Sequence, residues 1–309
     1  MARIGLIDVD HHNYPNLALM KISAYHKSIG DEVEWYMPFS ERYDKVYVSK
    51  VFSFTPDYDL VINADEVQRG GTGYAIKLEN GVEVYHPELD KPLPTEIEHI
   101  YPDYSIYPMY TQDTAYGFLT RGCPRGCAFC HVGNKEGRCA VKVADLSEFW
   151  RGQKNIILQD PNILACKQWK ELLQSLADSK ATVDFNQGID IRMITEEKIE
   201  ALKQIKIKEF HFAWDRYEDK DKVLPKFQLF AEKWGKKLQH NLMVFVLVNF
   251  NTTVEQDLER IYTLRDLGYW AYVMIYDKTH CKQIYRDIQR WVNNRYLFGS
   301  IKRFEDYKK

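Results

Sequence analysis

The chain has 309 residues, of which 45% are hydrophobic and 28% charged, and its formal net charge is −2 at pH 7. This composition is that of a globular protein with one large or two modest domains, and it argues against a strongly basic nucleic-acid-binding protein. No apolar run reaches the roughly 20 residues that span a bilayer, so we expect no membrane partner. Asp8 and Asp10 interrupt the region where a signal peptide would be apolar. We therefore expect the protein to be cytoplasmic.

The first hundred residues predict a small Rossmann-like α/β domain. A helix is expected to begin at Pro15 and to end at Gly30. Four apolar strands are expected at residues 2–9, 32–38, 45–52 and 59–65. The glycine-rich stretch 69–74 follows the last strand, and a proline-rich stretch from about Glu88 to Pro108 predicts a linker. We place this domain at 1–108.

From residue 109 to 280 the pattern changes to strands that alternate with amphipathic helices. Six apolar strands are expected at 116–120, 155–160, 182–190, 209–215, 241–250 and 270–277. Such an alternation predicts parallel strands joined by right-handed helical crossovers. Because six units are fewer than the eight of a closed barrel, we expect a partial (β/α)6 barrel, a partial TIM barrel, with its site at the carboxyl ends of the strands.

The last segment, 281–309, has eight Lys or Arg against three Asp or Glu, a net charge of +5, and interleaved aromatic residues. It predicts a helical tail that packs its aromatic side chains and leaves a basic face in solvent. The alternative is a contact with RNA that uses the charges and the rings together.

Three of the six cysteines lie within eight residues, as Cys123, Cys127 and Cys130. Thiolates are soft ligands that favour zinc, copper(I) and iron–sulfur clusters. A structural zinc site takes four protein ligands, whereas a four-iron cluster held by three thiolates keeps one iron open for a further ligand. Gly122 before the first cysteine, with Pro124 and Gly126 between the first two, allows a short loop to wrap around such a cluster.

This loop, with Phe129 directly before its last cysteine, resembles the cluster loop of the radical S-adenosylmethionine (radical SAM) superfamily. The resemblance covers residues from about 115 to 280. It implies a [4Fe–4S] cluster on the three cysteines, with S-adenosylmethionine bound to the open iron and Phe129 against the adenine. It further implies reductive cleavage of the cofactor to a 5′-deoxyadenosyl radical, and an electron donor such as flavodoxin or ferredoxin.

The same resemblance supplies weaker candidates for binding the cofactor, at the ends of the later strands. They are Asp160, Asn162, Arg192, Asp215, Val248, Met274 and Tyr276. The residues themselves leave alternatives open, since Asp160 with Pro161 is also a plain turn and Arg192 can simply pair with Asp190. Glu255 follows the fifth strand, but Thr252 and Glu255 also predict a capping box for the next helix.

Cys139, Cys166 and Cys281 remain, and no second close pair accompanies them. Cys281, beside His280, is our only candidate for a catalytic residue, as a donor or acceptor of a hydrogen atom. Because no cysteine precedes Cys123, a second cluster and hence methylthiolation are disfavoured.

The amino-terminal domain resembles the cobalamin-binding domains of some radical SAM enzymes. Their Asp-x-His-x-x-Gly motif is matched by Asp10 and His12, but Pro15 replaces the glycine. We favour a scaffold without cobalamin, and the alternative is a cobalamin-dependent methylase. A second alternative is a non-catalytic protein that binds a metal or an iron–sulfur cluster. The substrate, whether small molecule, peptide or RNA, is not identified by these residues.

Overall fold

The computed structural model describes residues 1–10, 14–79, 82–235 and 242–307. Internal contacts divide the chain into two compact units. Unit 1 comprises Met1–Cys139 and Val143–Ile156, and unit 2 comprises Ala140–Lys142 and Ile157–Lys309. None of the helices in these described stretches combines the length and the apolar character needed to cross a membrane.

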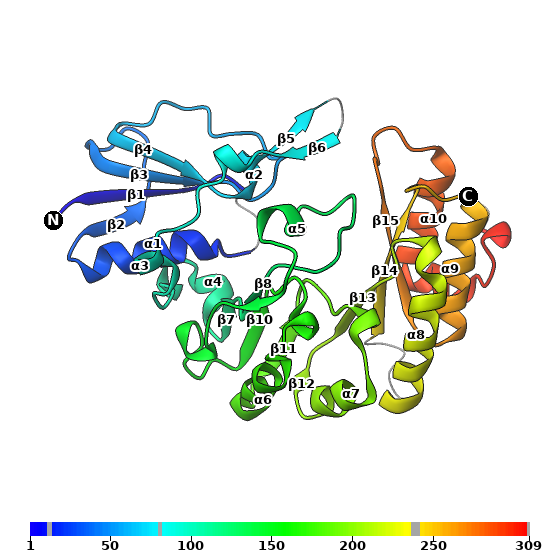
Figure 1. Cartoon of the computed structure of the whole chain (residues 1–309). Helices are drawn as coiled ribbons and strands as arrows, with labels where there is room; N and C mark the ends of the chain where they lie inside the picture. Colours follow the sequence, from blue (N-terminus) through cyan, green and yellow to red (C-terminus); the bar gives the residue numbers. More distant parts are fainter. Residues whose placement is uncertain (11–13, 80–81, 236–241, 308–309) are drawn as a thin grey trace. The chain divides into compact units, whose positions relative to one another are not determined.

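Unit 1 is built on a parallel four-stranded sheet in the order β2-β1-β3-β4 (Figure 1). Its strands are β1 (Arg3–Asp8), β2 (Glu32–Trp35), β3 (Tyr43–Ser49) and β4 (Ala64–Gly70). The helix α1 (Leu17–Ser28) packs Leu19 and Ile22 against Ile4 and Leu6 of β1. The helix begins two residues later than predicted, because the side chain of Asn16 caps it by accepting a hydrogen bond from the Leu19 N–H at 3.2 Å.

The fourth strand of this sheet differs from the sequence prediction. Residues 59–65 were expected to form it, but β4 occupies 64–70. In the observed register Val67 lies beside Val46 of β3 and joins the core, whereas Leu60 and Val61 are 56% and 91% exposed. The apolar run therefore misplaced the strand, because Leu60 and Val61 are exposed and precede the residues that pair with β3.

The remainder of unit 1 consists of short elements. They are α2 (Thr72–Ala75), β5 (Ile76–Glu79), β6 (Val82–Tyr85), η1 (Pro87–Leu89), α3 (Thr95–Glu98), η2 (Tyr104–Ile106), α4 (Pro108–Thr111), β7 (Thr114–Gly117), β8 (Thr120–Arg121), α5 (Val132–Lys135) and η3 (Leu146–Glu148). The proline-rich stretch is held to its neighbours, since the Tyr107 hydroxyl donates to Asp8 at 2.6 Å and the Tyr104 hydroxyl donates to the Phe149 carbonyl at 2.6 Å.

Unit 2 alternates parallel strands with helices. Its elements are β9 (Val141–Lys142), β10 (Asn155–Leu158, which crosses the boundary between the units), η4 (Ile163–Ala165), α6 (Trp169–Ser179), β11 (Thr182–Phe185), η5 (Ile191–Met193), α7 (Glu196–Lys203), β12 (Lys206–Ile207), β13 (Phe210–Ala213), η6 (Tyr217–Asp219), α8 (Lys220–Trp234), β14 (Leu242–Val248), α9 (Val254–Asp266), β15 (Trp270–Ile275), α10 (Gln283–Asn293), α11 (Arg295–Ser300) and η8 (Phe304–Asp306). Five of the six strands expected after residue 115 are present as β10, β11, β13, β14 and β15, whereas the first, expected at 116–120, is divided into β7 and β8 in unit 1. The α/β class with parallel strands is confirmed.

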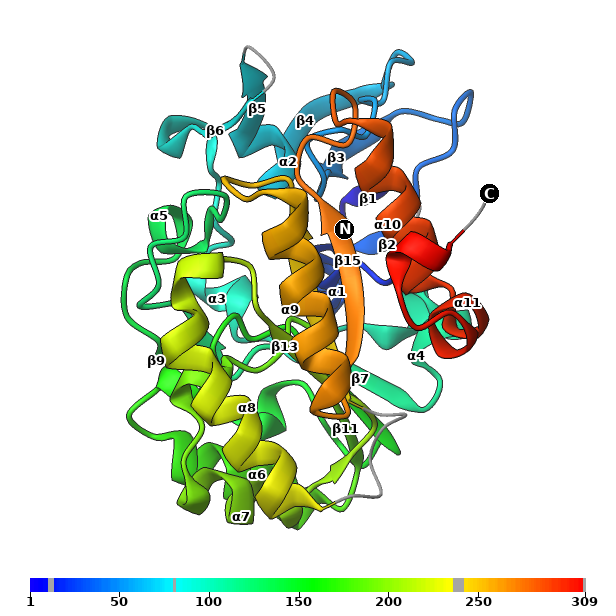
Figure 2. The same ribbon diagram turned by 90° about the vertical axis from the view of Figure 1, so that its right-hand side faces the viewer.

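Apart from the two-residue β9, the strands of unit 2 belong to two hydrogen-bonded sheets, so the described residues of this unit contain no continuous barrel wall. One sheet has β12, β11 and β10 as neighbours, and the other has the order β13-β14-β15. The Ile189 N–H, just after β11, donates to the His211 carbonyl of β13 at 2.7 Å and so links the two sheets. The helices α8, α9 and α10 lie along the β13-β14-β15 sheet (Figure 2).

The carboxyl-terminal segment forms α10 and α11, which bury their aromatic side chains. Tyr285, Trp291 and Phe298 are at most 6% exposed, and the guanidinium of Arg265 lies 3.5 Å from the centre of the Phe298 ring. Tyr296, in contrast, is 90% exposed. The main role of the aromatic residues here is therefore packing.

Candidate functional site

The three clustered cysteines lie in unit 1, on the loop between β8 and α5. None of them forms a disulfide, and Cys130 is exposed while Cys123 and Cys127 are half-buried. Phe129 is half-buried as well. All three cysteines thus belong to one loop, and each is at least partly accessible to solvent.

The ends of this loop are tied together by Glu136, directly after α5. The Glu136 carboxylate pairs with Arg121 at 3.0 Å and accepts a hydrogen bond from the Gly122 N–H at 3.1 Å. The Cys123 N–H donates to the Gly137 carbonyl at 3.1 Å, and the Cys130 N–H donates to the Cys127 carbonyl at 3.0 Å. The loop is therefore closed, because side-chain and backbone hydrogen bonds hold its two ends together.

Gly122 is required by this geometry. Its φ is +83°, in the left-handed region, and a Cβ there would lie 2.2 Å from the Cys139 carbonyl oxygen. Gly126 differs, since a Cβ at that position would meet only the end of the Arg138 side chain. Only Gly122 is therefore fixed by the backbone.

Gly122→Ala is expected to lower the free energy of unfolding by about 2 kcal/mol or more, because left-handed backbone strain adds to a clash with a carbonyl. The matched variant Gly126→Ala is expected to change it by less than about 1 kcal/mol, because Arg138 can move aside. Urea unfolding of both variants measures the difference. Equal stabilities would show that the loop does not depend on the conformation of Gly122.

In the described parts of the chain, no three His, Cys, Asp or Glu side chains are placed so that they hold one metal ion together. The donor set nevertheless fits an iron–sulfur cluster by its chemistry, since three cysteines share one short loop.

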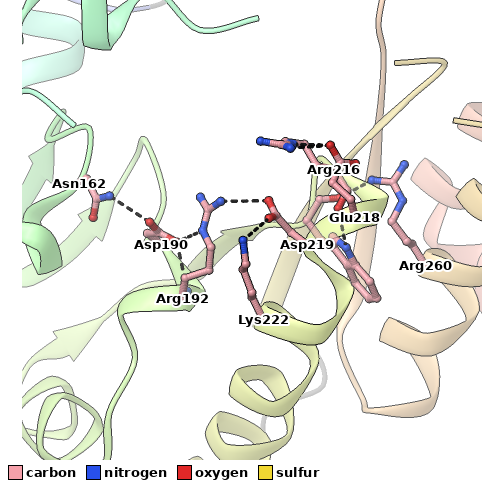
Figure 3. A network of polar contacts seen from close by, with 9 residues as sticks. Asn162, Asp190, Arg192, Arg216, Glu218, Asp219, Lys222 and Arg260 are labelled. Atoms are coloured by element: carbon pink, nitrogen blue, oxygen red, sulfur yellow. Dashed lines mark hydrogen bonds and ion pairs between the residues drawn. The ribbon is translucent and has the colours of Figure 1, made fainter. Parts of the chain in front are cut away.

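A second group of candidates lies in unit 2, at the carboxyl ends of β10, β11 and β13 (Figure 3). The Asn162 amide donates to Asp190 at 3.1 Å, and Asp190 pairs with Arg192 at 2.7 Å. Arg192 also pairs with Asp219 at 3.3 Å, just before α8. Three strand ends are thereby joined through one chain of polar side chains.

Within this group, the pairing of Arg192 with Asp190 agrees with one of the two sequence interpretations. Asp160 and Asn162 are 3% and 1% exposed, and Arg192 keeps a quarter of its side chain exposed. Burial of this kind fixes the side chains in place. The polar groups at these strand ends are therefore held in fixed positions before any ligand arrives.

Asp215 follows β13 and lies near the same network. Its Oδ1 atom is buried and has no hydrogen-bond partner among the described residues. Burial raises the pKa of Asp215 to about 6, although Arg260, the backbone of Leu247 and Arg192 each lower it in part. A carboxyl group with this pKa changes its charge close to neutral pH.

Asp215→Asn is expected to stabilise the protein at pH 7. Because the pKa is higher in the folded than in the unfolded chain, the stability that this group contributes is present below pH 3.8 and is lost as the pH rises to about 6. The gain at pH 7 should approach roughly 3 kcal/mol and should vanish near pH 4. Urea unfolding at the two pH values measures it, with the exposed Asp178→Asn as the control. A gain that is the same at both pH values would contradict the assignment.

Arg260 of α9 binds the backbone at the carboxyl ends of β13 and β14. Its side chain is fully buried, and it donates to the carbonyls of Trp214 and Leu247 at 2.5 and 2.7 Å. It also pairs with the buried Asp257 at 2.5 Å, and Asp257 accepts from the Asn249 N–H at 3.1 Å. Asn249 has a left-handed φ of +63°. This buried pair therefore shapes the backbone on which Asp215 stands.

The remaining strand-end candidates lie on β14, on β15 and after them. The carbonyl of the buried Val248 accepts from the Tyr276 N–H at 3.0 Å, so part of this backbone is engaged within the protein. Met274 is 38% exposed and lies beside Leu247 in the sheet. The ring of Tyr276 packs edge-on against the ring of Phe250, and the two ring centroids are 4.7 Å apart. An apolar and aromatic surface thus follows these two strands.

The capping box after β14 was predicted one residue too early. Thr253, and not Thr252, caps α9, and its partner is Gln256 instead of Glu255. The hydroxyl of Thr252 is buried without a hydrogen-bond partner among the described residues. The sequence contains two overlapping Thr-x-x-Glu/Gln patterns, and the turn at Asn249 and Asn251, both left-handed, selects the second.

The other sequence candidates are scattered. Cys139 is exposed and Cys166 is buried, and Cys281 is half-buried with its thiol 3.4 Å from the Lys278 carbonyl. His12, the candidate cobalt ligand, lies outside the described residues.

A comparison with protein-family models and with curated proteins finds no match to this chain.

Sequence reasoning missed Glu136, Asp219 and Arg260, which organise the loop and the strand ends. Asp257 and Arg260 are spaced three residues apart on α9, a spacing that places both on one helix face. That spacing is common on exposed helices, so it gave no sign that the pair is buried. Asp219 and Glu136 carry no distinctive pattern either.

Proposed function

We propose that the protein is a radical SAM enzyme whose [4Fe–4S] cluster is held by Cys123, Cys127 and Cys130. The observation that carries the proposal is a closed loop that carries three cysteines, built around the left-handed Gly122 and tied by Glu136. When bound, the cluster and S-adenosylmethionine supply one-electron reductive chemistry. The reaction subtype and the substrate stay open.

In this proposal the chain's own residues bind and orient the ligands. The three thiolates would hold the cluster, and Phe129 would contact the adenine. Asn162, Asp190 and Arg192 form a prearranged polar group that suits the amino and carboxylate groups of an amino acid. Asp215 offers a buried carboxyl oxygen for a hydrogen bond.

The fold supports the same proposal. Unit 2 alternates strands with helices and has two sheets linked at Ile189, which is compatible with part of a (β/α)6 barrel whose polar residues gather at the carboxyl ends of the strands. The α/β part ahead of the cysteine loop acts in the proposal as a scaffold without cobalamin.

Anaerobic reconstitution with iron and sulfide tests the proposal. The reconstituted protein should contain about four iron atoms per chain and, after reduction with dithionite, should convert S-adenosylmethionine to 5′-deoxyadenosine and methionine. Bound zinc in place of iron, or an intact cluster that never cleaves the cofactor even with a range of candidate substrates, would favour a non-catalytic metal or electron-transfer protein.

A further inference from the structure

We propose that Asp90 and Lys135 are positioning residues for the cysteine loop, because their ion pair fixes the helix that directly follows Cys130. The proposal rests on the proposed function, since it concerns the group that the loop holds. It gives the amino-terminal part of unit 1 a defined task.

The contact itself is close and shielded. The Lys135 ammonium lies 2.8 and 2.7 Å from the two carboxylate oxygens of Asp90. The two side chains are only 20% and 16% exposed, and Asp90 also accepts a hydrogen bond from the Tyr85 hydroxyl at 2.9 Å. Pairs that are shielded and carry an additional hydrogen bond are stronger than exposed ion pairs.

The position of Lys135 in the chain links this ion pair to the cysteine loop. Lys135 is the last residue of α5, which has four residues and cannot be stable alone. Its neighbour Glu136 ties the two ends of the loop through Arg121 and Gly122. Lys135 therefore connects the closed loop to a segment 45 residues earlier in the chain.

A second contact supports the same connection independently. His131, which lies between Cys130 and α5, has its Nε2 atom 3.4 Å from a carboxylate oxygen of Glu83 on β6. Both ends of the α5 turn thus contact the segment formed by β6 and η1. Such support keeps a loop close to its ligand-binding conformation and lowers the entropy lost when the ligand binds.

The test measures how fast a ferrous chelator removes iron from the reconstituted protein. Asp90→Asn and Lys135→Met are expected to lose iron about five- to tenfold faster than the unchanged protein, because one shielded, charge-assisted contact is lost. Lys135→Arg keeps the charge and should restore slow loss. The control is Asp65→Asn, which breaks the exposed pair of Arg42 and Asp65 in the same unit and should change nothing.

The outcomes separate this inference from the proposed function. If the unchanged protein holds a cluster and Asp90→Asn and Lys135→Met lose iron at its rate, the positioning role is wrong and the proposed function stands. If the unchanged protein holds no cluster, the proposed function fails and this inference fails with it. Circular dichroism spectra of each variant confirm that it is folded. If Lys135→Arg loses iron as fast as Lys135→Met, a general structural role replaces the positioning role.

Discussion

Replacing Cys123, Cys127 or Cys130 by alanine is expected to abolish cluster binding. A four-iron cluster held by three thiolates loses a third of its protein ligands with each substitution, and the loop contains no further thiol as a substitute. Iron and sulfide content after anaerobic reconstitution should therefore fall from about four atoms of each per chain to nearly none. The formation of 5′-deoxyadenosine should be lost together with the iron.

The chain contains its own controls for this experiment. Cys139, Cys166 and Cys281 lie outside the loop, so their replacement by alanine should leave the iron content unchanged. Cys139 is the most informative, because its carbonyl lies against Gly122 while its exposed side chain is not needed by the loop. Retention of a full cluster in Cys127→Ala but not in Cys139→Ala would overturn the ligand assignment.

Arg260→Met is expected to produce the largest loss of stability in unit 2. The substitution leaves the Asp257 carboxylate buried without its cation, and it leaves the Trp214 and Leu247 carbonyls without a donor that they now have. Breaking one side of a buried pair costs about 3–5 kcal/mol. Urea or thermal unfolding measures the loss.

Two further variants serve as comparisons for Arg260→Met. Lys170→Met removes the exposed ion pair with Glu197, in which both side chains are more than 60% exposed, and should cost less than about 1 kcal/mol. The double variant Arg260→Met with Asp257→Leu removes the isolated charge and should recover part of the loss. A cost for Arg260→Met as small as that for Lys170→Met would show that the buried pair does not hold the strand ends.

The strands of unit 2 could be predicted from the sequence because their signal is local. In β14 and β15 alternate apolar side chains, such as Val244, Val246 and Val273, are fully buried, so the apolar pattern and the structure report the same property. The prediction at 59–65 failed for a different reason, since Leu60 and Val61 are exposed and the less apolar β4 pairs with β3. Hydrophobicity alone does not predict which segment will pair with a neighbouring strand.

The candidate site was predicted only in part. The cysteine spacing and the polar residues after β10 and β11 are visible in the sequence. Glu136, Asp219 and Arg260 are not, because each acts through partners brought close by folding, such as Arg260 with the carbonyl of Trp214, 46 positions away. The sequence indicates which residues have a distinctive chemistry. It does not indicate which of the many charged residues hold them in place.

The contacts of residues 88–108 have a practical consequence for anyone who wishes to produce the cysteine loop without the preceding sheet. A protein shortened to begin at residue 109 would lack Asp90, the partner of Lys135, and also Tyr104, whose hydroxyl holds the Phe149 carbonyl. It would equally lack Asp103, which joins this stretch to Lys27 of α1 at 2.6 Å. The chain from β1 to α5 is thus best expressed, crystallised and engineered as one piece.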